Sequence, residues 1–213
     1  MNYVNIFSKN NSNPFLFSYR RCPYAMRARM ALIDSEINFN AFEISLKIKP
    51  SEMLEISPKG TVPVLVVEKE VIDESIDIMM WAYTNGNSLQ YSKFEKNLIN
   101  LGLGLIQKND NEFKLCLDQY KYKYSINYPS KLNDELRNSC LFFLDILEER
   151  LAKNLYLLSD KVSFADIAIM PFIRQFANVD MSYFSSLQCS KVQSWLLKLI
   201  NSELFIKAMI KPR

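Results

Sequence analysis

The spacing of apolar residues changes once along this chain, and that change constrains the fold more than any other feature of the sequence. Up to about residue 84, short apolar runs typical of strands alternate with segments whose apolar residues have helical spacing. A polar, turn-rich stretch follows at 84–88. Beyond it every clear segment has helical spacing, and no strand-like alternation is found. The pattern predicts an α/β domain followed by an all-α domain.

A chain of 213 residues with 49% apolar residues is long enough to build two small domains with real cores. Its first residues are polar and rich in Asn and Ser, which is typical of a loosely held end. The predicted organisation is an N-terminal tail at 1–13, an α/β domain at 14–84, a linker at 85–91 and a helical domain at 92–213. The clearest helical segments of the last domain begin near Ser92 and cover 132–151, 164–177 and 192–200.

The strands and helices of the first domain are predicted in the order βαβ, α, ββα. They are a strand at 15–19, a helix at 23–33, a strand at 39–44, a helix at 51–56, strands at 62–67 and 71–72, and a helix that begins at 73–75. The apolar face of the first helix is wide enough for burial on two sides, and the core face of the last consists of Ile76, Met79, Met80 and Tyr83. This order of elements is that of a thioredoxin-like domain.

Composition excludes several kinds of chemistry. The chain has no histidine, so a histidine general base and the commonest metal ligand are both absent. Four scattered cysteines indicate neither a disulfide framework nor a zinc site, and no metal is expected. A net charge of +3 is too small and too dispersed to indicate nucleic acid as a partner. Neither a signal peptide nor a membrane span is found, so the expected location is cytoplasmic.

Cys22 is the strongest candidate for a reactive group. It follows a predicted strand and precedes Pro23, which suits the first position of a helix. A sulfur at the start of a helix lies where backbone N–H groups and the positive helix end favour a thiolate. The upstream Arg20 and Arg21 would add positive potential if either pointed inward. Because Ala25 stands where a second cysteine of a C-x-x-C motif would be, a mixed disulfide has to form with an external thiol.

Two further elements accompany this cysteine. In a thioredoxin-like domain, the proline that opens the third strand lies opposite the cysteine with a cis peptide bond, and Pro63 falls at that place. The backbone groups of Val62 would then bind an extended peptide as an added strand does. Glu74 and Ser75 begin a helix whose free N–H groups suit a carboxylate, although the same pair would also serve as a plain helix cap.

Together these segments resemble the glutathione transferase family. The resemblance rests on SYRRCPYAMRARMAL, SPKGTVPVL and DESIDIMMWAY in the first domain, and on a capping box formed by Ser163 and Asp166 in the second. The cysteine motif is most similar to the omega-like and related bacterial members. That resemblance implies thiol transfer, dehydroascorbate reduction and removal of glutathione from mixed disulfides, with glutathione as co-substrate and a homodimer as the assembly.

The resemblance also implies roles for individual residues. Cys22 would be the nucleophile, and the γ-glutamyl end of glutathione would bind Glu74 and Ser75. The other implied contacts are Tyr24 beside the cysteinyl portion, Lys49 at the glycyl carboxylate, the Val62 backbone paired with the cysteinyl backbone, and Pro63 in the cis form.

Two alternatives stay open at this point. Other classes of the family use a Tyr or Ser at the end of the first strand to hold a glutathione thiolate, and Ser18 and Tyr19 lie there. If one of them served, the enzyme would conjugate glutathione to electrophiles. The second alternative is a transferase-like interaction or regulatory protein without turnover, because one fold hosts many functions.

Overall fold

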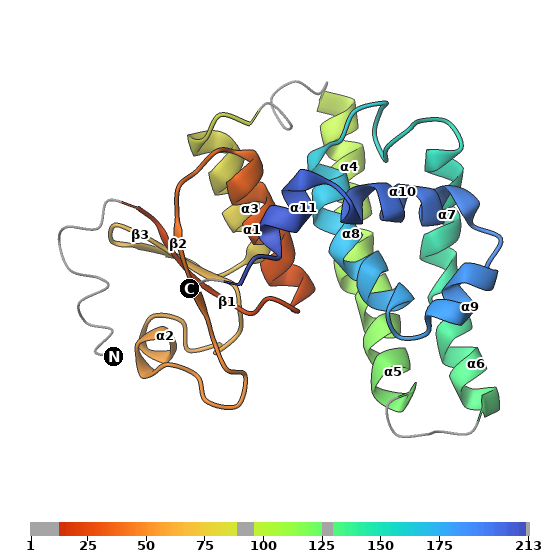
Figure 1. Cartoon of the computed structure of the whole chain (residues 1–213), viewed down its shortest axis with the longest axis horizontal. Coiled ribbons are helices and arrows are strands. Elements are labelled where there is room, and N and C mark those ends of the chain that lie inside the picture. The colour runs from red at the N-terminus through yellow and green to blue at the C-terminus, as the bar shows by residue number, and fades with distance from the viewer. Residues whose placement is uncertain (1–12, 89–95, 125–129, 212–213) are drawn as a thin grey trace. The chain divides into compact units, whose positions relative to one another are not determined.

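The computed structural model describes residues 13–88, 96–124 and 130–211 of the chain, and these residues belong to two compact units (Figure 1). One unit is built from the chain up to Leu89 and from Glu203 onward, and the other spans Gln90–Ser202. Most of the predicted tail at 1–13, much of the predicted linker at 85–91 and the helix start near Ser92 lie outside the described residues.

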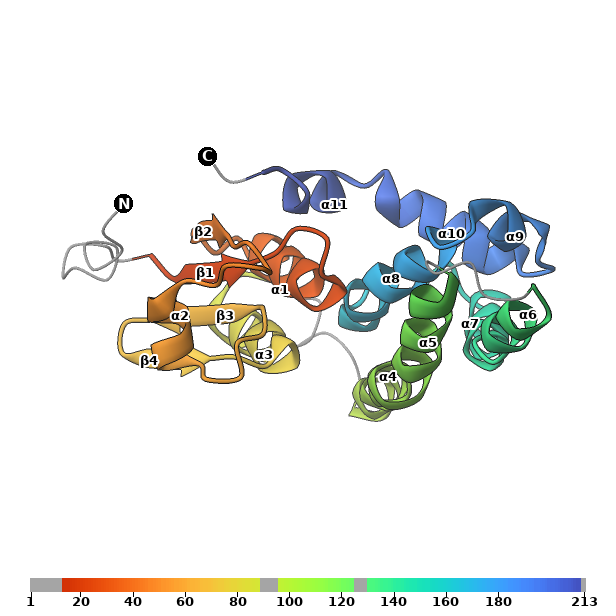
Figure 2. The ribbon, with the colours of Figure 1, turned by 90° about the horizontal axis from the view of Figure 1, so that it is seen from below.

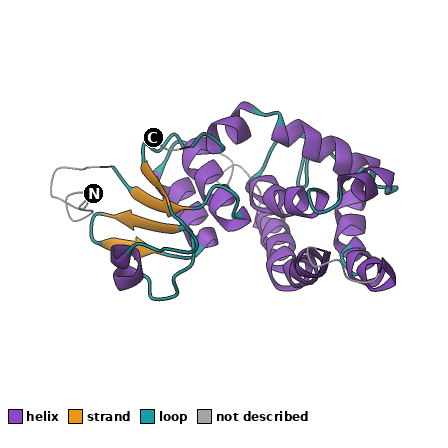
Figure 3. Cartoon of the chain, turned by 60° about the horizontal axis from the view of Figure 1, so that its bottom comes forward, coloured by secondary structure: helices purple, strands orange, loops and turns teal. Residues whose placement is uncertain are grey.

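The first unit contains a four-stranded sheet in the order β2-β1-β3-β4. The strands are β1 (Phe15–Ser18), β2 (Asn40–Glu43), β3 (Val64–Val67) and β4 (Glu70–Ile72). β1 pairs parallel with β2 and antiparallel with β3, which pairs antiparallel with β4. All the described strands belong to this unit, as Figure 3 shows by colour. The thioredoxin-like order predicted from the sequence is therefore confirmed.

Three helices complete the thioredoxin-like part: α1 (Pro23–Asp34), α2 (Ser51–Ile56) and α3 (Ser75–Asn85). α1 and α3 lie side by side (Figure 1). α1 is buried along most of its length, as its wide apolar face predicts, but the buried residues include Arg27 and Arg29. Two arginines in the interior of one helix need partners, because burying an unpaired charge is costly.

The core face of α3 differs from the predicted one. Met79 and Tyr83 are buried as expected, but Ile76 and Met80 are only half-buried. The buried positions are Ser75, Ile78, Met79, Ala82 and Tyr83. Compared with the expected orientation, α3 is turned about its axis so that its first residue, Ser75, faces inward, where it bonds to the buried Arg27. Apolar spacing alone could not anticipate a polar residue on the core face.

The last helix, α11 (Glu203–Ala208), belongs to the first unit, whereas the sequence division grouped it with the helical domain at 92–213. It lies against α1 (Figure 2), and Arg29 Nε donates a hydrogen bond of 2.8 Å to the Ala208 carbonyl. Helical spacing predicts that a segment is a helix but not which unit it packs on.

The described part of the second unit contains helices and no strand, in agreement with the sequence (Figure 2). Its helices are α4 (Lys96–Lys108), the π-helical turn η2 (Asn109–Phe113), α5 (Lys114–Tyr124), α6 (Ser130–Asn138), α7 (Leu141–Leu151), α8 (Phe164–Ala177), α9 (Met181–Ser186) and α10 (Ser190–Ile200). The helix predicted at 132–151 is interrupted at Ser139 and Cys140. There the Cys140 N–H bonds to the Arg137 carbonyl, a shorter span than in an α-helix. No helix of the described chain is long and apolar enough to cross a membrane.

α8 forms the centre of the second unit, since nearly all of its residues are buried. The predicted capping box is present at its start. The buried Asp166 carboxylate accepts hydrogen bonds from the Ser163 N–H at 2.9 Å, the Leu157 N–H at 3.0 Å and Trp195 Nε1 at 2.8 Å. Burial raises the pKa of Asp166, against the effect of these hydrogen bonds.

Candidate functional site

Cys22 lies at the N-cap of α1, with an extended backbone at φ −76° and ψ 123°. Pro23 occupies the first turn of the helix, and the Cys22 side chain makes no capping hydrogen bond to the free N–H groups of that turn. The thiol is half-buried, and its sulfur donates a hydrogen bond to the Val62 carbonyl oxygen over 3.7 Å. The sulfur therefore lies at the positive end of a helix and beside the segment that leads into β3.

The Val62–Pro63 peptide bond is cis, as the sequence predicted. Pro63 directly precedes β3, so Val62 stands at the end of the loop that carries Lys59 and Thr61. The contact between Cys22 and Val62 brings together two segments 40 positions apart in the chain.

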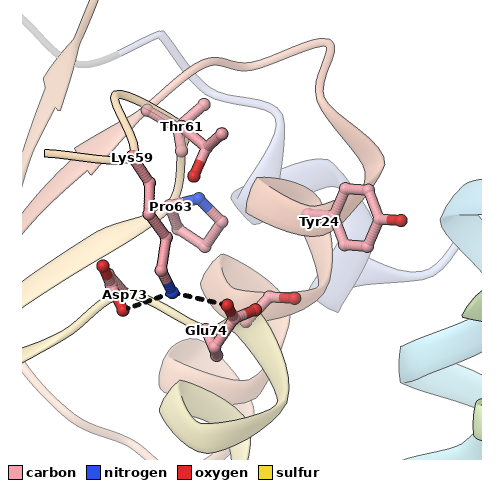
Figure 4. A pocket seen from close by; sticks show the side chains of 8 residues that line it. Tyr24, Lys59, Thr61, Pro63, Asp73 and Glu74 are labelled. Atoms are coloured by element: carbon pink, nitrogen blue, oxygen red, sulfur yellow. Dashed lines mark hydrogen bonds and ion pairs between the residues drawn. The ribbon is translucent and has the colours of Figure 1, made fainter. Parts of the chain in front are cut away.

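A cavity of about 320 Å³ opens beside this contact (Figure 4). Its lining consists of Tyr24, Lys59, Thr61, Val62, Pro63, Asp73, Glu74 and Ser75. Five of the residues singled out in the sequence analysis are among them: Tyr24, Val62, Pro63, Glu74 and Ser75. The cavity wall therefore combines the helix start after Cys22, the loop before β3 and the start of α3.

Lys49 is not part of this lining. It is exposed, and its ammonium lies close to Gly60, where an added Cβ would come within 3.3 Å of Nζ. The lysine that does line the cavity is Lys59, which was not among the residues expected from the sequence. Its ammonium lies between two carboxylates, 3.0 Å from Asp73 Oδ1 and 2.6 Å from Glu74 Oε1 (Figure 4).

This ion-pair cluster perturbs its members. Hydrogen bonds to Glu74 and Asp73 raise the pKa of Lys59. Asp73 also accepts a hydrogen bond of 2.7 Å from the Ser57 hydroxyl, and that bond together with Lys59 lowers the pKa of the Asp73 carboxyl. The cluster therefore gathers one ammonium and two carboxylates on one side of the cavity.

The start of α3 forms another part of the wall. Glu74 is the N-cap residue, yet its side chain makes no capping hydrogen bond. The Glu74 side chain thus leaves the first N–H groups of the helix uncapped, which is the condition for an anion site. Ser75 is 5% exposed, and its hydroxyl accepts a hydrogen bond of 3.1 Å from Arg27 Nε. The Arg27 guanidinium also lies 5.0 Å from the centre of the Tyr24 ring.

A second buried arginine supports the segment before Cys22. Arg29 bonds to the Ser18 hydroxyl and donates a hydrogen bond of 2.9 Å to the Arg20 carbonyl. Burial lowers the pKa of Arg29 to about 10, while the negative charges of Glu43 and of an ionised Cys22 oppose the shift. Arg29 is therefore a cation within electrostatic range of the thiol. Arg20 or Arg21 was expected to supply positive potential to the thiol if its side chain pointed inward. The Arg21 side chain is exposed.

The alternative residues Ser18 and Tyr19 lie elsewhere. Ser18 is completely buried and engaged with Arg29. Tyr19 packs against an apolar cluster that includes Phe15 and Phe17. Cys22, Ser18 and Tyr19 are all outside the cavity lining, but the Cys22 sulfur contacts Val62, which belongs to that lining. The geometry therefore favours Cys22 over the other two.

The other cysteines have different surroundings. Cys140 and Cys189 are buried, and burial raises the pKa of Cys140 to about 12 and that of Cys189 to about 11. Both thiols are therefore protonated and poor nucleophiles at neutral pH. Among the described residues, no group of three or more His, Cys, Asp or Glu side chains could hold a metal ion.

Three charged residues at or behind this site were missed: Arg27, Arg29 and Lys59. The two arginines lie inside an amphipathic helical pattern, where a charged residue is normally assigned to the solvent face. Lys59 falls within the quoted segment SPKGTVPVL, between a proline and a glycine, so its position in a turn beside Pro63 was the only available signal.

Both units match known proteins. The profile of the glutathione S-transferase N-terminal domain matches residues 16–87, and that of the C-terminal domain matches residues 111–203. The probable glutathione S-transferase parA of Nicotiana tabacum is 22% identical over 210 residues, which are 95% of this chain and 91% of that protein. The pyrimidodiazepine synthase of Drosophila melanogaster is 37% identical over 65 residues, which are 29% of this chain and 27% of that protein.

Solved structures agree with the fold. The glutathione transferase of Pseudomonas putida gives a TM-score of 0.84 at 17% identity, over 99% of this chain and 96% of that one. Since the two domain profiles of one family match in chain order and together span more than half of the sequence, this chain belongs to the glutathione S-transferase family and is a glutathione transferase.

Proposed function

We propose that this transferase is of the cysteine type, with Cys22 as its nucleophile. Its proposed reaction is the reduction of glutathione mixed disulfides, as in a thiol transferase, or of dehydroascorbate, as in a dehydroascorbate reductase. One observation carries the proposal: the only cysteine among the described residues at a helix start beside the cavity has its sulfur 3.7 Å from the carbonyl of Val62, which lines that cavity. A thiol placed there is next to any peptide that pairs with the Val62 backbone.

The cavity wall suits each part of glutathione. The Val62 backbone would pair with the cysteinyl residue, and the Tyr24 ring would pack beside it. The uncapped start of α3 and the Ser75 hydroxyl would bind the γ-glutamyl carboxylate, and Glu74 would bind its ammonium. Lys49 lies outside the cavity lining, and its long exposed side chain would meet the glycyl carboxylate from the rim.

The reaction then has two balanced steps. The Cys22 thiolate attacks the glutathione sulfur of a mixed disulfide, forming an enzyme–glutathione disulfide and releasing the substrate as a thiolate, which takes a proton from water. A second glutathione thiolate attacks that disulfide, releases glutathione disulfide and regenerates the Cys22 thiolate. The substrate is reduced to its thiol and one free glutathione is oxidised, because its sulfur joins the glutathionyl group that came from the mixed disulfide. The positive end of α1 and the Arg29 charge attract the negative sulfur that reacts in the first step and leaves in the second.

The relatives support this direction. The matched structure from Pseudomonas putida holds one glutathione disulfide per subunit, and glutathione disulfide is the product of the second step proposed here. Conjugation of glutathione to electrophiles is less favoured, because Ser18 is buried against Arg29 and Tyr19 packs into an apolar cluster.

The test compares wild type with Cys22→Ser on the mixed disulfide of glutathione and 2-mercaptoethanol, and with an aromatic chloride as conjugation substrate. We expect Cys22→Ser to lower mixed-disulfide turnover by about 10³-fold or more, because a hydroxyl cannot form the disulfide intermediate. Cys116→Ser is the matched control, since Cys116 is half-buried and does not line the cavity. Its turnover should equal that of wild type.

Two outcomes contradict the proposal. Conjugation that survives or rises in Cys22→Ser, with no mixed-disulfide turnover in wild type, assigns a conjugating transferase that holds the glutathione thiolate without a covalent step. Silence in both assays together with no binding of glutathione assigns a non-catalytic interaction protein.

We further propose that the protein is a cytoplasmic homodimer, in which the first domain of one chain pairs with the second domain of its partner. This rests on the family resemblance. Sedimentation equilibrium at micromolar concentration measures the assembly, and a mass of one chain contradicts it. Cell fractionation measures the location.

A further inference from the structure

Arg27 is a charge in an unusual place. It lies in the middle of α1, the helix that begins at Cys22, and it is 0% exposed. A guanidinium in the interior is tolerated only when its N–H groups are well bonded. One of these bonds runs from Arg27 Nε to the Ser75 hydroxyl oxygen over 3.1 Å, between two buried side chains. This bond joins the helix of the thiol to the helix whose start lines the cavity.

The direction of that bond determines what the hydroxyl can do. A serine hydroxyl has one proton to donate and two lone pairs. Because an arginine side chain only donates, the bond from Arg27 occupies a lone pair of Ser75 and leaves its proton available. Within the described part of the chain, no acceptor takes that proton, and Ser75 lines the cavity. The hydroxyl is therefore set to donate into the cavity.

The charges around the cavity also favour a ligand carboxylate beside the Ser75 hydroxyl. Asp73 and Glu74 carry the negative charges, and Lys59 is already ion-paired with both. Arg27 lies behind Ser75 and Tyr24, on the α1 side of the wall. A ligand group with one ammonium and one carboxylate is attracted to this arrangement in one orientation, with its ammonium at Glu74 and its carboxylate at Ser75.

We infer that Arg27 is a positioning residue for the carboxylate subsite: through Ser75 it selects ligands that carry an α-carboxylate on the γ-glutamyl group. The inference rests on the proposed function, since it takes glutathione as the occupant of the cavity. Arg27 itself is buried behind the wall and acts by fixing the Ser75 hydroxyl as a donor and by adding a positive charge near the carboxylate.

The test compares two ligands by calorimetry, glutathione and 4-aminobutyryl-cysteinylglycine, which keeps the ammonium but lacks the α-carboxylate. Wild type should bind glutathione more tightly. In Arg27→Met we expect the affinity for glutathione to fall about tenfold, as for loss of a hydrogen bond to a charged group, and the affinity for the analogue to stay within about twofold. Since Met is a similar length and apolar, it fills the same space without the charge.

Ser75→Ala provides an independent measurement that does not depend on how Arg27→Met folds. It should also lower the discrimination between the two ligands, and adding Arg27→Met to it should cause a smaller further loss than Arg27→Met causes alone, because only the charge of Arg27 is then left to remove. Full discrimination retained in Ser75→Ala or in a folded Arg27→Met overturns the inference, even if mixed-disulfide turnover is normal. Failure of wild type to bind either ligand would instead overturn the proposed function.

Discussion

The starts of α8 and α3 face the same chemical problem and answer it differently. Every helix begins with N–H groups that have no partner inside the helix. At α8 the capping box is complete, and the buried Asp166 carboxylate also accepts from the Leu157 N–H and from Trp195. At α3 the N-cap Glu74 makes no capping hydrogen bond, and its carboxylate bonds to Lys59 instead. One start is closed by the protein itself, and the other is left open beside a cavity.

This difference separates stability from function. The closed start at α8 joins three segments of the second unit through the buried Asp166 carboxylate. The open starts of α1 and α3 give up that stabilisation, because a side-chain cap is worth about 1 kcal/mol. What they retain is the ability to place N–H groups against an anion, which in the proposed function is the Cys22 thiolate at α1 and a ligand carboxylate at α3.

The largest effect is expected when the closed start is opened. Asp166→Ala leaves the N–H groups of Ser163, Leu157 and Trp195 without an acceptor in the core. We expect a loss of about 3 kcal/mol or more in the free energy of unfolding, with a fall of roughly 6–12 °C in the midpoint of thermal unfolding. Circular dichroism at 222 nm follows this transition.

Asp160→Ala is the matched control for that substitution. Asp160 also accepts a backbone hydrogen bond, of 2.9 Å from the Leu155 N–H, but it is exposed. Its loss should cost less than about 1 kcal/mol, because water replaces the missing acceptor. Equal midpoints for the two variants would show that the buried carboxylate is not what closes the helix start.

A second, smaller effect tests the packing around the closed start. Gly102 of α4 lies against Phe164, the first residue of α8, and an added Cβ would come within 2.5 Å of the Phe164 ring. Because Phe164 is fully buried, its ring has little room to move, and we expect Gly102→Ala to destabilise the protein by about 1–3 kcal/mol.

Gly104 lies two residues further along the same helix and provides the control. A Cβ there meets nothing within 4 Å. Gly104→Ala should raise the free energy of unfolding by about 0.5–1 kcal/mol, the usual gain for alanine over glycine in a helix. Urea titrations of both variants measure the two changes, and a stabilising Gly102→Ala would contradict the close approach of α4 to Phe164.

The same contrast explains how far the sequence could be interpreted. The capping box at Ser163 and Asp166 and the cis Pro63 were predicted because their signals lie within a few residues or within a fixed order of elements. The burial of Arg27 was not predicted, because it depends on a bond to Ser75, 48 positions away. The packing of α11 on Arg29 spans 179 positions. Local patterns predict helix starts well, but only the folded chain shows which charges lie behind them.

The smallest effect concerns stability in acid. As the pH falls, the contributions of Asp73 at the start of α3 and of Asp166 at the start of α8 to the free energy of unfolding should change in opposite directions. Hydrogen bonds from Ser57 and Lys59 lower the pKa of Asp73 below its ordinary value of 3.8. The stabilisation by this carboxylate is therefore fully present above about pH 4 and is lost as pH falls through the folded-state pKa. For Asp166 burial raises the pKa. Protonation of Asp166 then favours the folded state, and the free energy of unfolding gains from Asp166 as the pH falls through that raised pKa.

Thermal midpoints of wild type, Asp73→Asn and Asp166→Asn between pH 2.5 and 7 separate these contributions. Asp73 is partly exposed, so Asp73→Asn should cost no more than about 1 kcal/mol at neutral pH. Its difference from wild type should shrink as the pH falls below about 4 and through the lowered folded-state pKa of Asp73, since a protonated Asp73 has lost the same ion pair. The difference between wild type and Asp166→Asn should instead widen in favour of wild type as the pH falls. If both differences shrink in acid, the donors around Asp166 stabilise its carboxylate more than burial destabilises it. The starts of α3 and α8 would then differ in exposure, but the stability contributed by Asp73 and by Asp166 would change in the same direction with pH.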